Sequence, residues 1–306
     1  MGINIQILKL LLEENNYSPL YGDILLIGRS TVTISDIRIR ELLQKYGIDA
    51  SKLLCTQKKN KTRHASEGFH IDDVKLFECL SDSINSITVL DISDYEGASI
   101  TVDLNYPIPK KLYNKFDFIF DSSVLDNIFN PAQGIVNMSN FLKSQGRVLH
   151  LHHSSFFPGS MVACNPEWFY SFYACNKFLD VKLYLAEQNS IGWNRFEFET
   201  TLYKYKPSFT YNEYYDRFKA ATGKSSVYYS LLLAEADEDW GDREITFPSN
   251  LQYISSSNEP NWTIREDKFN ASPRPILGKK RLGNDVRDIA TLPLSTDHFE
   301  FLTDKF

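Results

Sequence analysis

The chain has 306 residues, of which 42% are hydrophobic, 24% charged and 14% aromatic. This composition excludes disordered, collagen-like and disulfide-scaffold proteins. Acidic residues outnumber lysine and arginine by 39 to 33, which gives a formal net charge of −6. The chain as a whole therefore has no electrostatic reason to hold a polyanion, and nucleic acid is not an expected partner.

The apolar stretches are all much shorter than the ~20 residues that a membrane-spanning helix needs, so no membrane span is predicted. The first residues carry no secretion-signal pattern. The four cysteines lie far apart, at Cys55, Cys79, Cys164 and Cys175. This spacing favours reduced thiols over disulfides or a zinc site, and we expect a cytoplasmic protein.

Short apolar runs alternate with amphipathic segments along the first two thirds of the chain. In chain order we expect a strand at 23–28, helices at 35–47 and 71–84, strands at 86–92, 99–104 and 116–121, a helix at 131–143, a strand at 147–152, a helix at 166–177, and strands at 181–186 and 195–205. Residues 48–70 have a polar, basic, loop-like composition.

This alternation predicts an α/β fold: a Rossmann-like, mostly parallel sheet with helices on both faces. The last two strands have no helix between them, which indicates an antiparallel edge. Ligands of such sheets bind outside the carboxyl ends of the strands, so the residues that follow each strand are the candidates for function. They are Gly28, Arg29, Asp91, Asp103, Asp121, Ser122 and the residues from His150 to His153.

The composition changes after residue 206 to Tyr-rich and Pro-containing sequence. We expect a main domain at 1–206 and a C-terminal appended region at 207–306, with a helix near 212–221 and a few strands. Tyr211, Tyr214 and Tyr215 indicate packing or an oligomer contact, and a homodimer is the simplest arrangement. Two basic clusters, at 58–64 and 279–281, are typical of solvated loops, although either could meet a phosphate.

Asp91 ends a predicted strand, where one carboxylate can accept hydrogen bonds from both ribose hydroxyls of a nucleotide cofactor. The alternative is an aspartate that caps the following turn. Gly28 is a single glycine where the dinucleotide fingerprint has three, and it precedes Asp91 by 63 residues rather than ~20. These departures disfavour NAD, FAD and ATP. They favour a cofactor without a pyrophosphate, such as S-adenosylmethionine.

Four stretches resemble one known family: Leu90–Ala98, Asp103–Asn105, Phe116–Asp121 continuing through Asn130-Pro131, and Gly146–His150. They are similar to the class I S-adenosylmethionine-dependent methyltransferases, in particular to a branch found with bacterial surface-polysaccharide genes. The resemblance spans roughly residues 22 to 187. It implies that the cofactor contacts Gly28 and Arg29 at its methionine end, Asp91 and Ile92 at its ribose, Asp103 and Leu104 at its adenine, and Asp121 and Ser122 at the pocket floor.

The chain departs from that branch after the strand at 116–121. The branch has Asp-Gly-Gly-Thr-Leu-Glu-His there, whereas this chain has bulkier serines at Ser122 and Ser123 and the pair Asp126-Asn127 in place of Glu-His. If that histidine acts as a base in the branch, this chain lacks it. A fold that has kept the architecture and lost catalysis is therefore a second hypothesis.

His150, His152 and His153 follow the predicted strand at 147–152. Strand alternation sends His150 and His152 to one face and His153 to the other. An acid/base role, a metal site and a structural role all remain open for them. Asp126 could accept a hydrogen bond from one of them and raise its pKa, so His150, His152 and Asp126 are the candidate catalytic residues.

Three functions follow from these patterns. The first is an S-adenosylmethionine-dependent methyltransferase acting on an oxygen or nitrogen of a small-molecule or saccharide acceptor. The second is a catalytically inactive binding or scaffold protein with the same fold. The third, a metal-dependent hydrolase built on the histidines, has the least support, and we predict no metal ligands. The aromatic helix at 166–177 indicates either core packing or an aromatic wall for a ligand.

Overall fold

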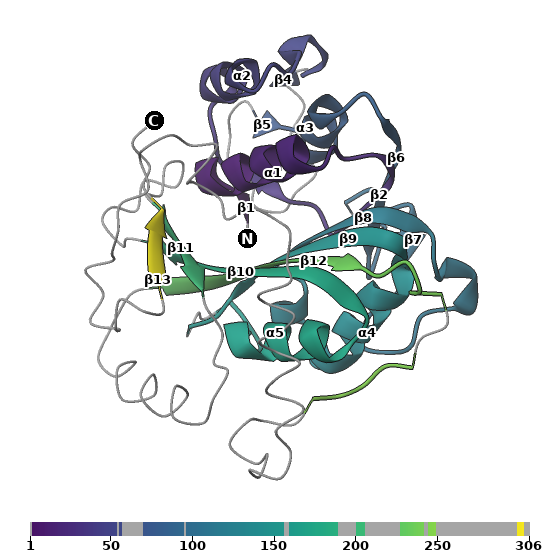
Figure 1. Ribbon diagram of the computed structural model, residues 1–306. Coiled ribbons are helices and arrows are strands. Elements are labelled where there is room, and N and C mark those ends of the chain that lie inside the picture. The colour runs from purple at the N-terminus through teal and green to yellow at the C-terminus, as the bar shows by residue number, and fades with distance from the viewer. Residues whose placement is uncertain are drawn as a thin grey trace.

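The computed structural model describes residues 2–53, 55–56, 70–94, 96–155, 159–188, 200–205, 227–241, 244–248 and 299–302. These residues build a sheet of nine strands (Figure 1). In spatial order the strands are β13 (Phe299–Leu302), β11 (Thr200–Tyr205), β10 (Phe178–Gln188), β12 (Val227–Ala236), β9 (Leu142–His153), β8 (Phe116–Ser122), β2 (Gly22–Ile27), β6 (Ile84–Asp91) and β7 (Ile100–Thr101).

The five strands β9, β8, β2, β6 and β7 form a parallel run, in which each strand is parallel to the next. β12 is antiparallel to both β9 and β10, and β11 is antiparallel to both β10 and β13. β11 and β12 therefore run opposite to the rest of the described sheet, whose strands all share one direction. The predicted α/β fold, with a mostly parallel sheet and an antiparallel edge, is confirmed.

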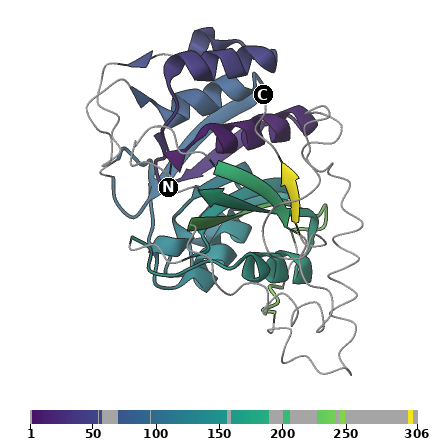
Figure 2. The ribbon, with the colours of Figure 1, turned by 90° about the vertical axis from the view of Figure 1, so that its left-hand side faces the viewer.

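Helices cover both faces of the sheet. α1 (Ile5–Tyr17), α2 (Asp36–Lys45) and α3 (Asp73–Leu80) lie on one side, and α4 (Pro131–Phe141) and α5 (Pro166–Cys175) lie on the other (Figure 1). The side view separates the purple and blue helices from the teal ones across the sheet (Figure 2). Local sequence explains where α4 begins, because Asn130 accepts from the Gln133 N–H and proline occupies the first turn.

Each helical layer encloses its own hydrophobic core, and β2 contributes to both. Ile24 and Leu26 belong to the core under α1, α2 and α3, whereas Leu25 and Ile27 belong to the core under α4 and α5. Successive side chains of a strand point to opposite faces, so a strand between two layers is apolar throughout. This is the reason that the run at 23–28 could be predicted as a buried strand.

Two elements differ from the expectations. α1 was not predicted, and it is buried nearly all round, which removes the one-sided pattern of an amphipathic helix. The sheet also continues beyond residue 206, because β12 is a central strand and β13 an edge strand. Residues 207–306 are therefore not wholly an appendage to the sheet. The helix expected at 212–221, the three tyrosines and both basic clusters lie outside the described residues.

The long connection between β2 and β6, expected from the sequence, holds α2, α3 and short pieces. These are β3 (Thr31–Val32), which pairs with β1 (Gly2–Ile3), the 3-10 turn η1 (Ala50–Lys52), and β4 (Cys55–Thr56) paired with β5 (His70–Ile71). None of the described helices has the length and apolarity needed to cross a membrane. Cys79, Cys164 and Cys175 are free thiols.

Candidate functional site

The strand order reverses between β2 and β8. From β2 the chain builds β6 and β7 on one side, and it then returns to form β8 and β9 on the other side. Ligands of open α/β sheets bind in the crevice outside the carboxyl ends of the strands at such a switch point. Gly28 and Arg29 follow β2 directly, and Asp121 and Ser122 end β8, so this edge is the candidate site.

Gly28 and Asp91 lie next to each other at this edge. Gly28 has a φ of +70°, and its N–H donates to the Leu90 carbonyl at 2.7 Å. A Cβ added to Gly28 would lie 3.4 Å from Val124 Cγ2 and 3.9 Å from Asp91 Oδ2. The glycine thus supplies a left-handed turn and leaves space beside the carboxylate. The structure brings these two predicted residues together.

The half-buried Asp91 carboxylate faces a polar rim. Its Oδ1 accepts a hydrogen bond from the Ile92 N–H at 2.6 Å, and this N–H is its hydrogen-bond donor among the described residues. The Asp91 carbonyl accepts from Val102 N at 3.0 Å, which places Asp103 close by. Ile92 is 64% exposed, and Leu104 is buried beneath this edge.

The Asp103 carboxylate accepts hydrogen bonds from the nearby Asn105. Its Oδ1 accepts from the Asn105 N–H at 2.9 Å and from Asn105 Nδ2 at 2.8 Å. Asn105 in turn accepts from the Asn130 N–H at 2.9 Å, ahead of α4. The predicted ribose and adenine positions are thus neighbours on one rim, and their carboxylates remain next to solvent.

Arg29 is held by carboxylates of α3. Its Nε donates to Asp73 Oδ1 at 2.7 Å, and its Nη2 donates to Asp72 Oδ2 at 2.8 Å. Burial acts to lower the pKa of Arg29, but the charges and hydrogen bonds of Asp73 and Asp72 together outweigh it, and the pKa is raised. The side chain is 7% exposed. Its Nε and Nη2 are thus committed to the two aspartates, while its Nη1 lies 3.5 Å from the Glu96 carbonyl.

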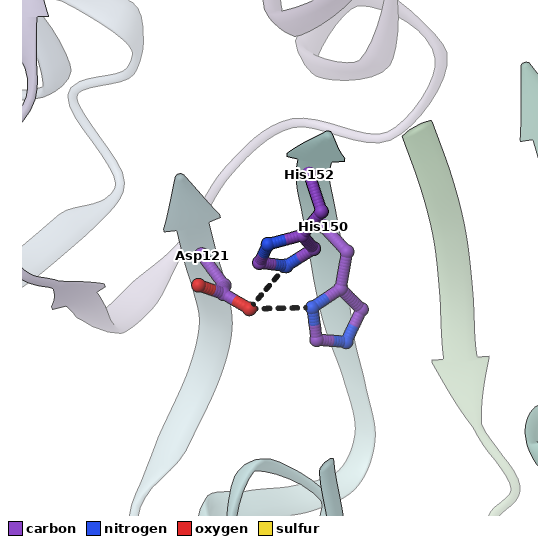
Figure 3. Close-up of side chains that lie close together, drawn as sticks. All are labelled: Asp121, His150 and His152. Atoms are coloured by element: carbon purple, nitrogen blue, oxygen red, sulfur yellow. Dashed lines mark hydrogen bonds and ion pairs between the residues drawn. The ribbon is translucent and has the colours of Figure 1, made fainter. Parts of the chain in front are cut away.

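Asp121 lies at the centre of a buried polar network (Figure 3). Its Oδ2 lies 2.8 Å from His150 Nδ1 and 2.7 Å from His152 Nε2, and all three residues are 0% exposed. The sheet register explains the contact, because Asp121 is the cross-strand partner of His150. His150 and His152 share one face of β9, as strand alternation predicted.

That face packs against the aromatic helix α5. The Phe169 ring stacks on His150 at 5.1 Å and on His152 at 5.3 Å between centroids. Tyr173 Oη lies 2.5 Å from His150 Nε2. Of the two interpretations of this helix, core packing is the one that these buried rings fit. Tyr173 and Phe169 are partners of the histidines that the sequence analysis missed.

Asp126 joins the network from η3 (Leu125–Asn127). Its carboxylate accepts from Ser123 Oγ at 2.8 Å and from the His153 N–H at 3.0 Å, and it lies 2.5 Å from His153 Nδ1. Its Oδ1 lies 3.6 Å from His152 Nδ1. The expected pairing of Asp126 with one of the histidines is confirmed, with His153 as the nearer partner.

The charges of this network follow from the balance between burial and the contacts of its carboxylates with its histidines. Burial acts to lower the pKa of His152, but Asp121 and Asp126 outweigh it and raise that pKa to about 9. Burial lowers the pKa of His150. The pKa of Asp121 and that of Asp126 are lowered because the histidines outweigh the burial that would raise them. At neutral pH an imidazolium at His152 thus lies between two carboxylates.

Apart from Arg29, held by α3, and the buried Leu104, the predicted site residues fall into two groups. Gly28, Asp91, Ile92 and Asp103 form an accessible rim at the switch point. Asp121, Ser122, Asp126, His150 and His152 are buried, and none of them is exposed to a ligand in this arrangement. The Asp72-Asp73 pair at the start of α3 was the missed signal for the fate of Arg29.

No protein-family model matches the sequence, and no curated protein matches it. Solved structures similar to the chain include a SAM-dependent methyltransferase from Archaeoglobus fulgidus, at 12% identity, covering 74% of this chain and 93% of that one, with a TM-score of 0.36. Phosphoethanolamine N-methyltransferase 2 from Haemonchus contortus with S-adenosyl-L-methionine has 11% identity, coverages of 75% and 52%, and a TM-score of 0.36.

A putative Zn-dependent alcohol dehydrogenase from Rhodobacter sphaeroides is also similar, at 16% identity, covering 51% of this chain and 49% of that one, with a TM-score of 0.29. The chain spans about half the length of this dehydrogenase and of the Haemonchus enzyme. These low similarities carry no argument about the reaction, and fold does not determine function.

Proposed function

We propose that the protein is an S-adenosylmethionine-dependent methyltransferase that acts on an oxygen or nitrogen of a small-molecule or saccharide acceptor. The observation that carries the proposal is the pairing of Gly28 with Asp91 at the switch point of the sheet. A half-buried carboxylate beside an open glycine turn is suited to a ribose diol.

The residues of the rim fit this cofactor. Asp91 would accept from the ribose hydroxyls, and Gly28 would let the backbone approach the methionine end. Exposed Ile92 would lie beside the ribose, and Asp103, with the buried Leu104 behind it, would lie beside the adenine. S-adenosylmethionine carries no phosphate, which agrees with a first turn that has one glycine. When bound, it supplies an electrophilic methyl group on a sulfonium.

His150, His152 and Asp126 remain the proposed catalytic residues, and His152 can accept a proton only where it is neutral, above about pH 9. The Asp126 carbonyl accepts from Met161 N at 2.7 Å and from Val162 N at 3.2 Å. Because His150, His152 and Asp126 are buried, an acceptor reaches them only if the surrounding structure moves. Arg29, Asp121 and Ser122 remain proposed as supports of the cofactor pocket, and residues 207–306 as a source of acceptor or subunit contacts. The surface-polysaccharide branch, the cytoplasmic location and the homodimer stay predictions.

A second candidate is a catalytically inactive binding protein of the same fold. Two observations favour it: Arg29 is committed to Asp72 and Asp73, and the candidate catalytic residues are 0% exposed. A histidine locked between buried carboxylates is a poor base for an external acceptor, since a base must reach the proton that it removes. This candidate predicts ligand binding without turnover.

The test is calorimetric titration of S-adenosylmethionine and S-adenosylhomocysteine into the folded protein. Asp91→Asn should weaken binding at least tenfold, while Asp94→Asn, an exposed aspartate of the same loop, should leave it unchanged. No heat with the wild-type protein at millimolar ligand would contradict the cofactor. Binding that is followed by methyl transfer to an acceptor panel supports the enzyme, and binding without transfer favours the second candidate.

A further inference from the structure

Three potential metal-ligand atoms converge at the ends of β8 and β9. Asp121, His150 and His152 each offer one ligand atom within 4.8 Å of the other two, with His150 Nδ1 and His152 Nε2 at 2.8 and 2.7 Å from Asp121 Oδ2, and all three residues are buried (Figure 3). Two histidines two positions apart on one strand point the same way, and the parallel neighbour β8 brings the carboxylate to them. This set is separate from the rim around Asp91.

Each of these side chains has a polar partner on its far side. His150 Nε2 lies 2.5 Å from Tyr173 Oη, and His152 Nδ1 lies 3.6 Å from Asp126 Oδ1. The second oxygen of Asp121, Oδ1, accepts from the Val124 N–H at 3.3 Å. Metal-bound imidazoles in proteins are oriented in this manner by a carboxylate or another polar group on the nitrogen away from the ion.

The local charge also suits a cation. The two buried carboxylates of Asp121 and Asp126 lie in an apolar interior, close to the histidines on which Phe169 of α5 stacks. Buried carboxylates are costly unless they are paired or bind a metal. His152 Nδ1 makes no hydrogen bond within the described residues, because Asp126 is 3.6 Å away. A cation at the inner nitrogens would favour a proton on this outer nitrogen, facing Asp126.

We propose that Asp121, His150 and His152 form a binding site for a divalent transition-metal ion, with Zn²⁺ the best match. Two imidazole nitrogens and one carboxylate oxygen are a zinc-type ligand set, whereas Mg²⁺ and Ca²⁺ prefer oxygen ligands alone. Tetrahedral zinc at ~2.0–2.1 Å from each ligand separates the ligand atoms by roughly 3.3 Å. The Asp121 oxygen would therefore retreat by about half an ångström from each nitrogen.

The experiment is zinc titration of the chelator-treated, tag-free full-length protein without S-adenosylmethionine, with bound zinc counted by elemental analysis. The expected result is one zinc per chain in the wild-type protein and at least tenfold weaker binding in Asp121→Asn and His152→Gln. His153→Gln is the matched control, since it changes the adjacent histidine outside the set and should retain zinc. Folded wild-type protein that binds no zinc, or equal binding by Asp121→Asn, would overturn the proposal.

A second measurement covers variants that fail to fold. Co²⁺ added to the wild-type protein should give the visible ligand-field band of nitrogen-coordinated, tetrahedral cobalt, and Zn²⁺ should abolish it. The absence of that band at saturating Co²⁺ overturns the proposal. The zinc site and cofactor binding at the rim around Asp91 are tested by different ligands and different variants, so the failure of one leaves the other standing. Zinc bound to His150 and His152 would exclude these two residues as proton acceptors.

Discussion

Arg29 Nε donates to Asp73 Oδ1 at 2.7 Å, and this bond links the turn after β2 to the first turn of α3. The same aspartate accepts from the Ser30 N–H at 2.6 Å. Asp73 is 1% exposed, and burial raises its pKa although the Arg29 charge opposes this. The pair therefore fixes the backbone of the candidate site from beneath.

Removing one partner of a buried ion pair leaves an uncompensated charge. Asp73→Ala should lower the free energy of unfolding by about 3 kcal/mol, measured by urea denaturation. Glu78→Ala is the control, because the Lys75–Glu78 pair on the same helix is exposed and should contribute less than about 1 kcal/mol. Equal effects of the two substitutions would mean that the Arg29 pair is not energetically buried.

Gly28→Ala tests the left-handed turn beside Asp91. Gly28 and Gly47 both have a φ of +70°, so alanine at either position should cost about 1 kcal/mol of stability through backbone strain. A Cβ at Gly47 meets no atom within 4 Å, whereas one at Gly28 faces Val124 and Asp91. Only Gly28→Ala should weaken S-adenosylmethionine binding, by at least tenfold in calorimetry. A similar loss in Gly47→Ala would contradict a local role.

The pKa of His152 predicts how stability depends on pH in the chelator-treated protein. Folding raises that pKa from 6.5 to about 9, so the stabilisation is fully present below pH 6.5 and is lost as pH rises through 9. In that window the free energy of unfolding should fall by up to about 1.4 kcal/mol per pH unit. The His150 pKa is lowered, so its contribution already lies below this window.

Urea denaturation of the wild-type protein and of His152→Gln at several pH values from 6.5 to 9.5 measures this effect. The slope of the variant should be flatter by most of that amount, because glutamine does not titrate. Parallel slopes would show that the Asp121 and Asp126 charges do not hold a proton on His152.

Leu232→Ala tests whether the chain beyond residue 206 is part of the core. Leu232 is 0% exposed on β12 and pairs with His150 of β9. Truncation of a fully buried leucine should lower the free energy of unfolding by 2–5 kcal/mol in thermal or urea denaturation. Phe247→Ala is the control, since that ring is 66% exposed and its loss should change stability by less than about 0.5 kcal/mol. A silent Leu232→Ala would argue against a central β12.

The sequence allowed the parallel half of the sheet to be predicted because its strands carry their own pattern. β2 is apolar on both faces, and β8 and β9 end in polar residues that mark the carboxyl edge. The pairing of Gly28 with Asp91 followed from the rule that these ends meet at one edge. Asp126 was likewise expected beside a histidine.

What could not be predicted depends on long-range contacts. Asp73 lies 44 residues from Arg29, across the insertion between β2 and β6, so nothing local indicated that the guanidinium was already held. The position of β12 was missed for a similar reason, since a strand reveals its own periodicity and not its partners. The contact of Asp121 with both histidines required the register of two strands.

The insertion of β12 between β9 and β10 has a consequence for how the protein is made. A ribosome releases β9 and β10 before residues 227–236 emerge, so these two strands must wait for the strand that joins them in the sheet. During that interval β9 presents an open edge, the kind of surface that pairs with foreign strands. Late, non-local closure of this kind slows folding. Nascent chains of this protein should therefore depend on chaperones until the last central strand has been synthesised.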